Sequence, residues 1–433
     1  MIPEVERYWL KNAHVPVVLL ENNTFIPETR EGLCLVDLEI VAGKINQIKL
    51  ASEQLVNSPA IDLQKKIVFP LFIDLHTHLD KGHIWERSPN EEGTFDHALK
   101  TNLKDAQDYW QEEDIYRRME FGIKCSYAHG TKAIRTHIDS FGKQAEMSLG
   151  VFKTLQQKWS PKITLQAVSL VSLDYYQSPE GVALADKIAD IGGILGGVAY
   201  MNPQIDAQID RVFKLAQERG LNLDFHVDEN GDPNSICLHK IAQTTLKHEF
   251  TGSIICGHCC SLAVQPEEQV IETINLVKQA NIGIVSLPMC NLYLQDRHPS
   301  QTPYWRGVTK VHQLKQQGVA IGFASDNCRD PFYGFGDHDV LEVFTQSVRI
   351  AHLDTPYEDW CCTVTKTPAD LMGIPSLGRI GVGLEADLII FQARYFSELL
   401  SRPQSDRIVL HQGKQIDTTL PKYEELDDCV FNP

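Results

Sequence analysis

The sequence predicts an α/β protein: a (β/α)8 TIM barrel with a small β-sandwich built from both chain ends. Three observations support this fold class. The chain has 433 residues, which suits one large barrel with a satellite domain. Short apolar runs rich in β-branched residues alternate with longer polar stretches of helical spacing. Both chain ends contain strand-like segments separated by glycine turns.

The apolar runs supply the strands of the barrel. Near-continuous apolar strands separated by helices are typical of a parallel sheet that is covered on both faces. Eight strand–helix units within about 300 residues match a barrel of eight parallel strands. The runs lie at residues 66–80, 131–140, 162–171, 192–201, 221–230, 252–260, 281–290 and 319–327. We therefore expect the barrel domain to span residues 66–377.

The two ends of the chain have a different pattern. Residues 1–65 and 378–433 contain strand-like segments such as "PVVLLENNTF" and "LGRIGVGLEADLIIF". Each end is too short to form a stable sheet alone. We expect the two ends to pair into one β-sandwich domain.

Composition and charge are those of a soluble globular enzyme, with 43% hydrophobic and 22% charged residues. The formal net charge of −17 disfavours binding to nucleic acid or anionic lipid. We expect the first residues to form neither a signal peptide nor a transmembrane helix. Eleven scattered cysteines indicate reduced thiols. We expect a cytoplasmic homo-oligomer that binds a small molecule, without a nucleic-acid or membrane partner.

Polar residues are concentrated where the predicted strands end. Five of the eight strand ends carry His or Asp. Active sites of such barrels lie at the C-terminal strand ends, and buried polar groups are costly without partners. These residues therefore indicate an active site. They are His76, His78, His137, Asp139, His226, Glu229, His258, Asp326 and Asn327.

The spacing in "HTHLD" indicates half of a metal site. Side chains alternate along a strand, so His76 and His78 share one face. Two imidazoles on one face suit a borderline metal such as Zn2+ or Fe2+. His226 on the fifth strand and Asp326 on the eighth would complete the ligand set.

The chain resembles the amidohydrolase superfamily, and within it the cytosine deaminase-like group of metal-dependent hydrolases. The resemblance covers nearly the whole chain and runs through "PLFIDLHTHLDKG", "GTKAIRTHID", "FHVDEN", "NLYLQDR" and "SDNCRDPFYGFG". It implies that Glu229 shuttles protons and that His258 orients the attacking hydroxide. It also implies one divalent metal, Zn2+ or Fe2+, held by His76, His78, His226 and Asp326.

The reaction expected from these parts is deamination of an amino-substituted N-heterocycle of the pyrimidine, purine, pterin or triazine type. The metal would supply hydroxide at neutral pH, and Asp326 would take the proton of the water. Glu229 would protonate a ring nitrogen and assist loss of ammonia or an amine. We expect the neighbouring Asp228 to have a supporting role.

The expected substrate contacts are Lys81, Ser172, Asn327 and Phe332. The resemblance implies that cytosine deaminases carry Gln, Asp and Trp at the last three of these positions, so we expect cytosine to be a poor substrate. An alignment shifted by a residue or two would bring Gln166 to the substrate instead. Lys81 and the Asp-Asn pair also resemble enzymes that remove N-alkyl groups from hydroxylated triazines. Whether His137 and Asp139 support the metal ligands or touch substrate stays open.

The string "CGHCC" at residues 256–260 admits two other interpretations. A thioredoxin-type dithiol needs its first cysteine at a helix N-terminus, whereas Cys256 lies inside an apolar strand. A zinc knuckle needs a second ligand pair nearby, and none follows before Cys290. We therefore expect His258 to face the site and the cysteines to be structural.

Two alternative functions remain at this stage. A catalytically inactive barrel with a binding role would need a broken ligand set, and this set is intact. A ring-opening cyclic-amide hydrolase usually resembles the binuclear members of the superfamily. The resemblance implies that those members carry a bridging carboxylated lysine on the fourth strand. Residues 192–201 contain no lysine, so we expect a single metal.

Overall fold

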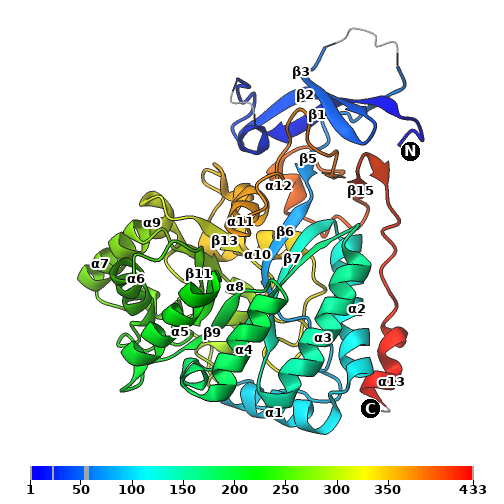
Figure 1. The fold of residues 1–433 in the computed structure, drawn as a ribbon. Helices are drawn as coiled ribbons and strands as arrows, with labels where there is room; N and C mark the ends of the chain where they lie inside the picture. Colours follow the sequence, from blue (N-terminus) through cyan, green and yellow to red (C-terminus); the bar gives the residue numbers. More distant parts are fainter. Residues whose placement is uncertain (1, 22–23, 53–57, 432–433) are drawn as a thin grey trace. The chain divides into compact units, whose positions relative to one another are not determined.

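The computed structural model describes residues 2–21, 24–52 and 58–431, and its contacts divide the chain into two compact units. Unit 1 comprises residues 1–73, 124–133 and 339–420. Unit 2 comprises residues 74–123, 134–338 and 421–433. Figure 1 shows the elements of both units. Within the described residues, none of the helices has both the length and the apolar character that a bilayer-spanning segment needs.

Most residues of the predicted parallel strands lie in unit 2, although β6 and β7 begin in unit 1. A five-stranded parallel sheet has the order β13-β12-β11-β10-β9, and a second sheet has the order β6-β7-β8. Isolated parallel bridges join Thr77 to Asp326 and Val168 to Ile194, and thereby connect the two sheets at both edges. The strands are β6 (Phe72–Thr77), β7 (Thr131–Asp139), β8 (Thr164–Leu170), β9 (Leu195–Ala199), β10 (Leu223–Val227), β11 (Ile254–His258), β12 (Gly283–Ser286) and β13 (Ile321–Phe323).

Helices follow the strands in alternation, and Figure 1 shows α3 to α7 in sequence along the outside of these strands. The helix ends carry residues that are typical of helix caps. Ser178 caps α4 by accepting from Gly181 N–H, and α5 ends at Gly220 in the left-handed conformation (φ +64°). The helices are α1 (Phe95–Tyr109), α2 (Glu112–Ala128), α3 (Gly142–Trp159), α4 (Pro179–Asp190), α5 (Ile205–Arg219), α6 (Cys237–Lys247), α7 (Glu267–Gln279), α8 (Pro288–Leu294), α9 (Val311–Gln316) and α13 (Asp427–Val430).

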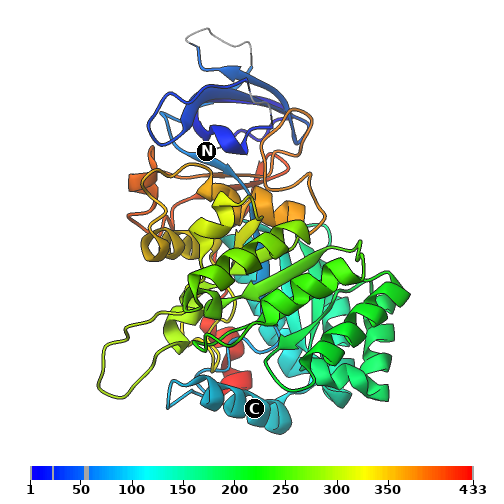
Figure 2. The same cartoon turned by 90° about the vertical axis from the view of Figure 1, so that its left-hand side faces the viewer.

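Unit 1 contains two four-stranded sheets that share one hydrophobic core. Leu10 and Val36 from one sheet lie in the same buried cluster as Val68 and Leu388 from the other. Figure 2 shows the N-terminal sheet in blue. The first sheet consists of β1 (Arg7–Pro16), β2 (Leu33–Val41), β3 (Lys44–Leu50) and β4 (Ala60–Asp62), and the second of β5 (Val68–Pro70), β14 (Leu388–Ile390), β15 (Ile408–His411) and β16 (Lys414–Gln415). The helices α10 (Val340–Ala351), α11 (Lys366–Leu371) and α12 (Phe396–Leu399) complete this unit.

The apolar run at 66–80, expected as one strand, forms two strands in different sheets. β5 pairs with β14, whereas β6 lies beside β7. The exchange of partners occurs between Leu71, whose N–H donates to Asp387, and Phe72, whose N–H donates to Gly130. An apolar run does not reveal such an exchange, because both strands are buried.

The close approach of β8, β9 and β10 generates a stability prediction. A Cβ on Gly196 of β9 would lie 2.3 Å from the carbonyl oxygen of Asp224 and 2.3 Å from Val168 Cγ1. Gly196→Ala should therefore lower the free energy of unfolding by about 1–3 kcal/mol through overpacking. Urea denaturation would measure the change.

The control is Gly150→Ala in α3, where a new Cβ meets nothing within 4 Å. Replacing an interior helical glycine by alanine should raise stability by roughly 0.5–1 kcal/mol. Equal stability of Gly196→Ala and the unmodified chain would contradict the packing argument.

Candidate active site

Four polar side chains from three strand ends lie together in unit 2. His76 Nε2 lies 3.2 Å from His226 Nε2, which in turn lies 3.3 Å from His78 Nε2. Asp326 Oδ1 lies 3.2 Å from His78 Nε2 and 3.7 Å from His76 Nε2. All four are buried, with exposed fractions of 6% or less. The structure thus brings together the four residues expected from the sequence to hold a metal.

These distances fit a divalent metal. Nitrogen ligands about 2.0–2.1 Å from a tetrahedral ion lie about 3.3 Å from each other. Imidazole nitrogens and one carboxylate are the donor set of Zn2+ or Fe2+ sites. Burial of a carboxylate and three imidazoles in contact is costly unless something compensates it. The donor set is therefore that of a metal centre.

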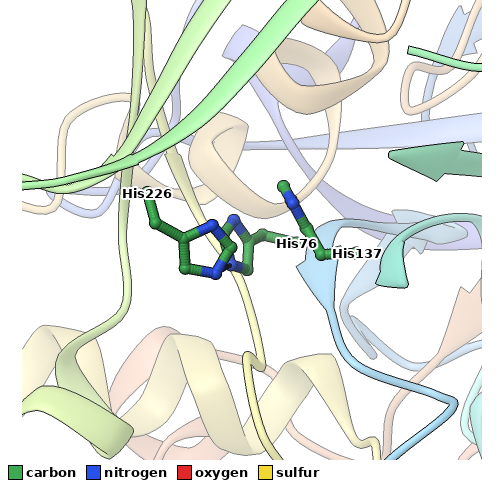
Figure 3. Close-up of side chains that lie close together, drawn as sticks. All are labelled: His76, His137 and His226. Carbon is green, nitrogen blue, oxygen red and sulfur yellow. Dashed lines mark hydrogen bonds between the residues drawn. The ribbon is translucent and has the colours of Figure 1, made fainter. Parts of the chain in front are cut away.

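His137 on β7 lies against the same cluster. Its ring centroid is 3.9 Å from that of His76 and 4.7 Å from that of His226 (Figure 3). Its Nε2 lies 3.8 Å from Asp224, a buried carboxylate that Arg135 binds at 2.8 Å. His137 is thus positioned beside the ligands, where it forms a second group of donors with His76 and His226.

The strand ends that carry the site have left-handed backbone conformations. Asp228 after β10, His258 at the end of β11 and Asp326 after β13 have φ of +49°, +67° and +64°. Such conformations are uncommon for residues other than glycine and cost free energy. They turn the chain sharply at the points where the polar side chains begin.

Glu229, His258 and Asn291 form a hydrogen-bonded group next to the metal ligands. Asn291 Nδ2 donates to Glu229 Oε1 at 3.2 Å and to His258 Nδ1 at 3.0 Å. Burial, reinforced by the negative charge of Asp326, raises the pKa of Glu229 well above its usual value. Burial lowers the pKa of His258 to about 4. Both shifts favour the uncharged forms of the two side chains, the carboxylic acid and the neutral imidazole.

Asp228 has a structural environment. Its two carboxylate oxygens accept hydrogen bonds from the backbone N–H groups of Cys237 and Leu238, at 3.0 Å each, at the start of α6. A carboxylate held by two backbone donors has little freedom to move a proton. These contacts favour the supporting role that the sequence suggested for Asp228.

A pocket of about 580 Å³ adjoins the cluster and is large enough for a small heterocycle. One wall is polar: Lys81 Nζ binds Asp139 Oδ1 at 2.7 Å, and Asn102 donates to Asp139 Oδ2 at 3.0 Å. Many of the apolar lining residues come from β8, β9 and the residues that follow them. The lining residues are His78, Lys81, Phe95, Leu99, Asn102, Leu103, Asp139, Phe141, Leu170, Val171, Ser172, Val198, Ala199, Tyr200, His226, Asp228, Glu229, Asn230, His258, Asp326, Asn327 and Phe332.

The four residues expected to contact substrate all line this pocket. Ser172 follows β8 and forms a parallel bridge with Val198. Asn327 donates to Asp330 at 2.7 Å, and the ring of Phe332 lies 5.4 Å from Lys81 Nζ. Gln166, the alternative to Ser172, instead accepts hydrogen bonds from Arg135 at 2.8 and 3.0 Å.

Four residues of the site were not predicted from the sequence. Asn291 lies within the quoted segment "NLYLQDR", but nothing in its spacing marks it as a partner of His258. Asp330 accepts a hydrogen bond from Asn327 and follows the eighth strand, and nothing in its spacing marks it as a partner of Asn327. Phe95 and Asn102 come from α1, and the apolar-run pattern says nothing about which helix faces the pocket.

The cysteines of residues 256–260 are buried thiols. Burial raises the pKa values of Cys256, Cys259 and Cys260 well above the usual value, so all three are protonated at neutral pH. All eleven cysteines of the chain are free and buried, as expected. Gly257 has a separate role: a Cβ there would lie 3.0 Å from His76 Cε1. The motif therefore leaves room for a metal ligand and presents His258.

The fold and this cluster are those of a metal-dependent hydrolase, with a carboxyl group of raised pKa beside a buried group of metal-type donors. The description "Amidohydrolase family" matches residues 122–416, more than half of the chain. The chain belongs to the amidohydrolase family. Membership implies a divalent metal and a TIM-barrel-type fold of mixed α/β content.

Two curated relatives resemble the chain along most of its length. A pterin deaminase of Rhizobium rhizogenes is 48% identical over 99% of this chain and 98% of its own. An N-isopropylammelide isopropyl amidohydrolase of a Pseudomonas species is 27% identical over 87% of this chain and 91% of its own. The chain is therefore a hydrolase of carbon–nitrogen bonds, an aminohydrolase, and the expected metal-dependent deamination of an N-heterocycle is confirmed.

Solved structures share the fold. A 5-methylcytosine deaminase of Klebsiella pneumoniae superimposes with a TM-score of 0.81 at 23% identity and covers 96% of this chain and 98% of its own. An N-isopropylammelide isopropylaminohydrolase of Burkholderia multivorans has a TM-score of 0.75 at 20% identity, over 96% of this chain.

The burial of the three cysteines predicts that they are dispensable for chemistry. Joint replacement of Cys256, Cys259 and Cys260 by alanine should leave the metal content unchanged, because none of the thiols is a ligand in the cluster. Elemental analysis of the purified variant checks this, and His258→Ala, measured beside it, should lose turnover. Activity that followed the redox state of the thiols would contradict the assignment.

Proposed function

We propose that this chain is a deaminase of pterin-type substrates, bicyclic heterocycles that carry an amino group on a carbon between two ring nitrogens. The observation that carries the proposal is the 48% identity to a pterin deaminase along essentially the whole of both chains. In the reaction one water adds to the amino-bearing carbon, ammonia leaves, and the carbon becomes a carbonyl.

We assign the metal to His76, His78, His226 and Asp326, with Zn2+ or Fe2+ as the ion. Such an ion, when bound, acts as a Lewis acid that lowers the pKa of water. The absence of lysine from β9 and the residues around it supports a single ion rather than a carboxylate-bridged pair. The contacts of Asp326 Oδ1 with His78 and His76 and its place in the pocket lining support Asp326 as the acceptor of the water's proton.

Glu229 is the proton donor to the ring nitrogen. Its raised pKa favours the protonated form, and its side chain lines the pocket. After transfer to the ring, Glu229 can receive a proton again and deliver it to the departing amine. Its place in the pocket lining, with Glu229 Oε1 3.3 Å from His258 Nδ1, supports this role.

His258 orients the attacking water through a defined tautomer. An amide Nδ2 can only donate, so the contact with Asn291 makes His258 Nδ1 an acceptor and leaves the proton of the neutral ring on Nε2. His258 lines the pocket, where this Nε2–H is available to the oxygen nucleophile. Asn291 is a positioning residue for both His258 and Glu229.

The pocket suits a substrate larger than cytosine. Ser172 is shorter than glutamine and leaves space beside the apolar wall of Leu170, Val171 and Val198. Asn327 offers both a donor and an acceptor to a substrate edge, whereas an ionised aspartate only accepts. Phe332 provides an aromatic face near Lys81, against which a planar ring can stack.

We extend the proposal to the architecture. The two sheets of unit 2 and their bridges support a closed barrel of eight strands, and the two sheets of unit 1 support a sandwich built from both chain ends. We keep the domain bounds 66–377 for the barrel and 1–65 with 378–433 for the sandwich. A cytoplasmic homo-oligomer without nucleic-acid partners also stays part of the proposal.

Glu229→Gln keeps the shape of the side chain but removes the transferable proton. We expect retained metal and a fall in turnover on the order of 10²-fold or more, the usual scale for a general acid–base group. In the unmodified enzyme kcat/KM should decline as the pH rises through the raised pKa of Glu229, because only the acid form donates. The variant should lack this basic limb.

The exposed Glu267→Gln serves as the control for the same chemical change and should keep the turnover and the pH profile. Near-normal turnover of Glu229→Gln would show that Glu229 is not the proton donor, and Asp228 would then be the residue to test.

Substrate preference tests the proposed function directly. We expect kcat/KM for ammonia release from pterin to exceed that from cytosine, because unmatched buried donors and acceptors discriminate strongly between substrates. Guanine and an N-alkylated hydroxytriazine complete the comparison. Efficient turnover of cytosine above the others would contradict the proposal, and preferred release of an alkylamine would favour the triazine-type reaction of the second relative.

A further inference from the structure

A second cluster of metal-type donors lies in unit 2, distinct from the ligands of the proposed active site. It consists of His83, Cys328 and His338, whose donor atoms lie within 4.8 Å of one another. Each of the three side chains is 2% exposed. His83 comes from the segment after β6, and the other two come from the segment between β13 and α10.

The geometry of this cluster resembles that of the active-site ligands. His83 Nε2 lies 3.1 Å from His338 Nε2, compared with 3.2 and 3.3 Å for the imidazole pairs of the catalytic cluster. The backbone holds the residues together, since His83 N–H donates to the carbonyl of Cys328 at 3.1 Å. His83 and His338 have φ of +63° and +55°, uncommon conformations that carry a free-energy cost.

The surroundings hold the cluster closed. A Cβ on Gly122 of α2 would lie 2.9 Å from His338 Nε2, so this helix approaches the imidazole as closely as a glycine allows. The ring of Phe121 packs edge-on against His83 with centroids 4.8 Å apart. Arg118 donates to the carbonyls of Asp80 and Gly82, and thereby fixes the segment that leads into His83.

The local charge permits a cation. Two guanidinium groups act electrostatically on His83, those of Arg118 and Arg329. Each is paired with a carboxylate, Arg118 with Asp114 and Arg329 with Glu86. The positive charges near the cluster are therefore balanced before any ion is added.

We propose that His83, Cys328 and His338 bind a second divalent transition metal, a Zn2+-type ion with structural rather than catalytic effect. Two imidazoles and one thiolate select a borderline or soft ion and exclude Mg2+ and Ca2+, which prefer oxygen ligands. When the metal binds, the Cys328 thiol loses its proton to solvent, and its sulfur donates a lone pair to the metal.

The ion would tie together two loops that also carry substrate-pocket residues. His83 lies two residues after Lys81, and Cys328 directly follows Asn327. A metal bridging them fixes the separation of Lys81 and Asn327 across the pocket. The two sites are independent in their donors, so the loss of one leaves the ligands of the other intact.

Elemental analysis tests the proposal on the full chain, expressed with Zn2+ and freed of loose metal by gel filtration. We expect two equivalents per chain in the unmodified protein and one in Cys328→Ala. Asp326→Ala, which removes a ligand of the proposed catalytic centre, should also retain one. Cys256→Ala is the matched control, a buried cysteine of the same unit, and should retain two.

Cobalt substitution identifies the ligand. The unmodified protein with Co2+ should show a thiolate-to-metal charge-transfer band that disappears in Cys328→Ala and persists in Cys256→Ala and Cys290→Ala. This measurement on the unmodified protein decides the question even if Cys328→Ala fails to fold. A single equivalent of metal, no thiolate band, or two equivalents in Cys328→Ala would each overturn the second site, without bearing on deamination.

Discussion

The burial of three imidazoles and a carboxylate at the ends of parallel strands is the constraint on which the rest of the structure depends. Groups that lie within 3.2 to 3.7 Å of each other and away from water are unfavourable as a bare cluster. A divalent cation compensates this cost. The surrounding structure holds the donors in place. Gly257 has no side chain and leaves space for His76, and Asp224, which pairs with Arg135, lies 3.8 Å from His137 Nε2.

The same cluster explains why two adjacent carboxylates have different roles. Asp228 and Glu229 follow one strand, yet their environments differ. Burial raises the pKa of both carboxyls, but two backbone N–H groups oppose the shift at Asp228, whereas the charge of Asp326 adds to it at Glu229. One carboxylate therefore fixes the chain and the other can exchange a proton. Electrostatic environment, rather than residue type, separates the two roles.

The sequence predicted the strands and the clustering of His76, His78, His226 and Asp326, because both follow from local rules. Apolar runs mark buried strands, and alternation puts His76 and His78 on one face. It could not predict what depends on tertiary geometry. The exchange of sheets between Leu71 and Phe72, the contact of Asn291 with His258, and the entry of α1 into the pocket wall all join segments distant in sequence. The His83–Cys328–His338 cluster escaped notice for the same reason, since its members lie outside the apolar runs.

Because all eleven cysteines are buried, their reaction with a thiol reagent measures local opening of the structure. A thiol-specific reagent has almost no target in the closed chain, so its rate of reaction measures how often each region becomes accessible. The two units can be followed separately in a single labelling experiment read by peptide mass. Cys34, Cys125, Cys361 and Cys362 report on unit 1, and the seven others, including Cys328, report on unit 2.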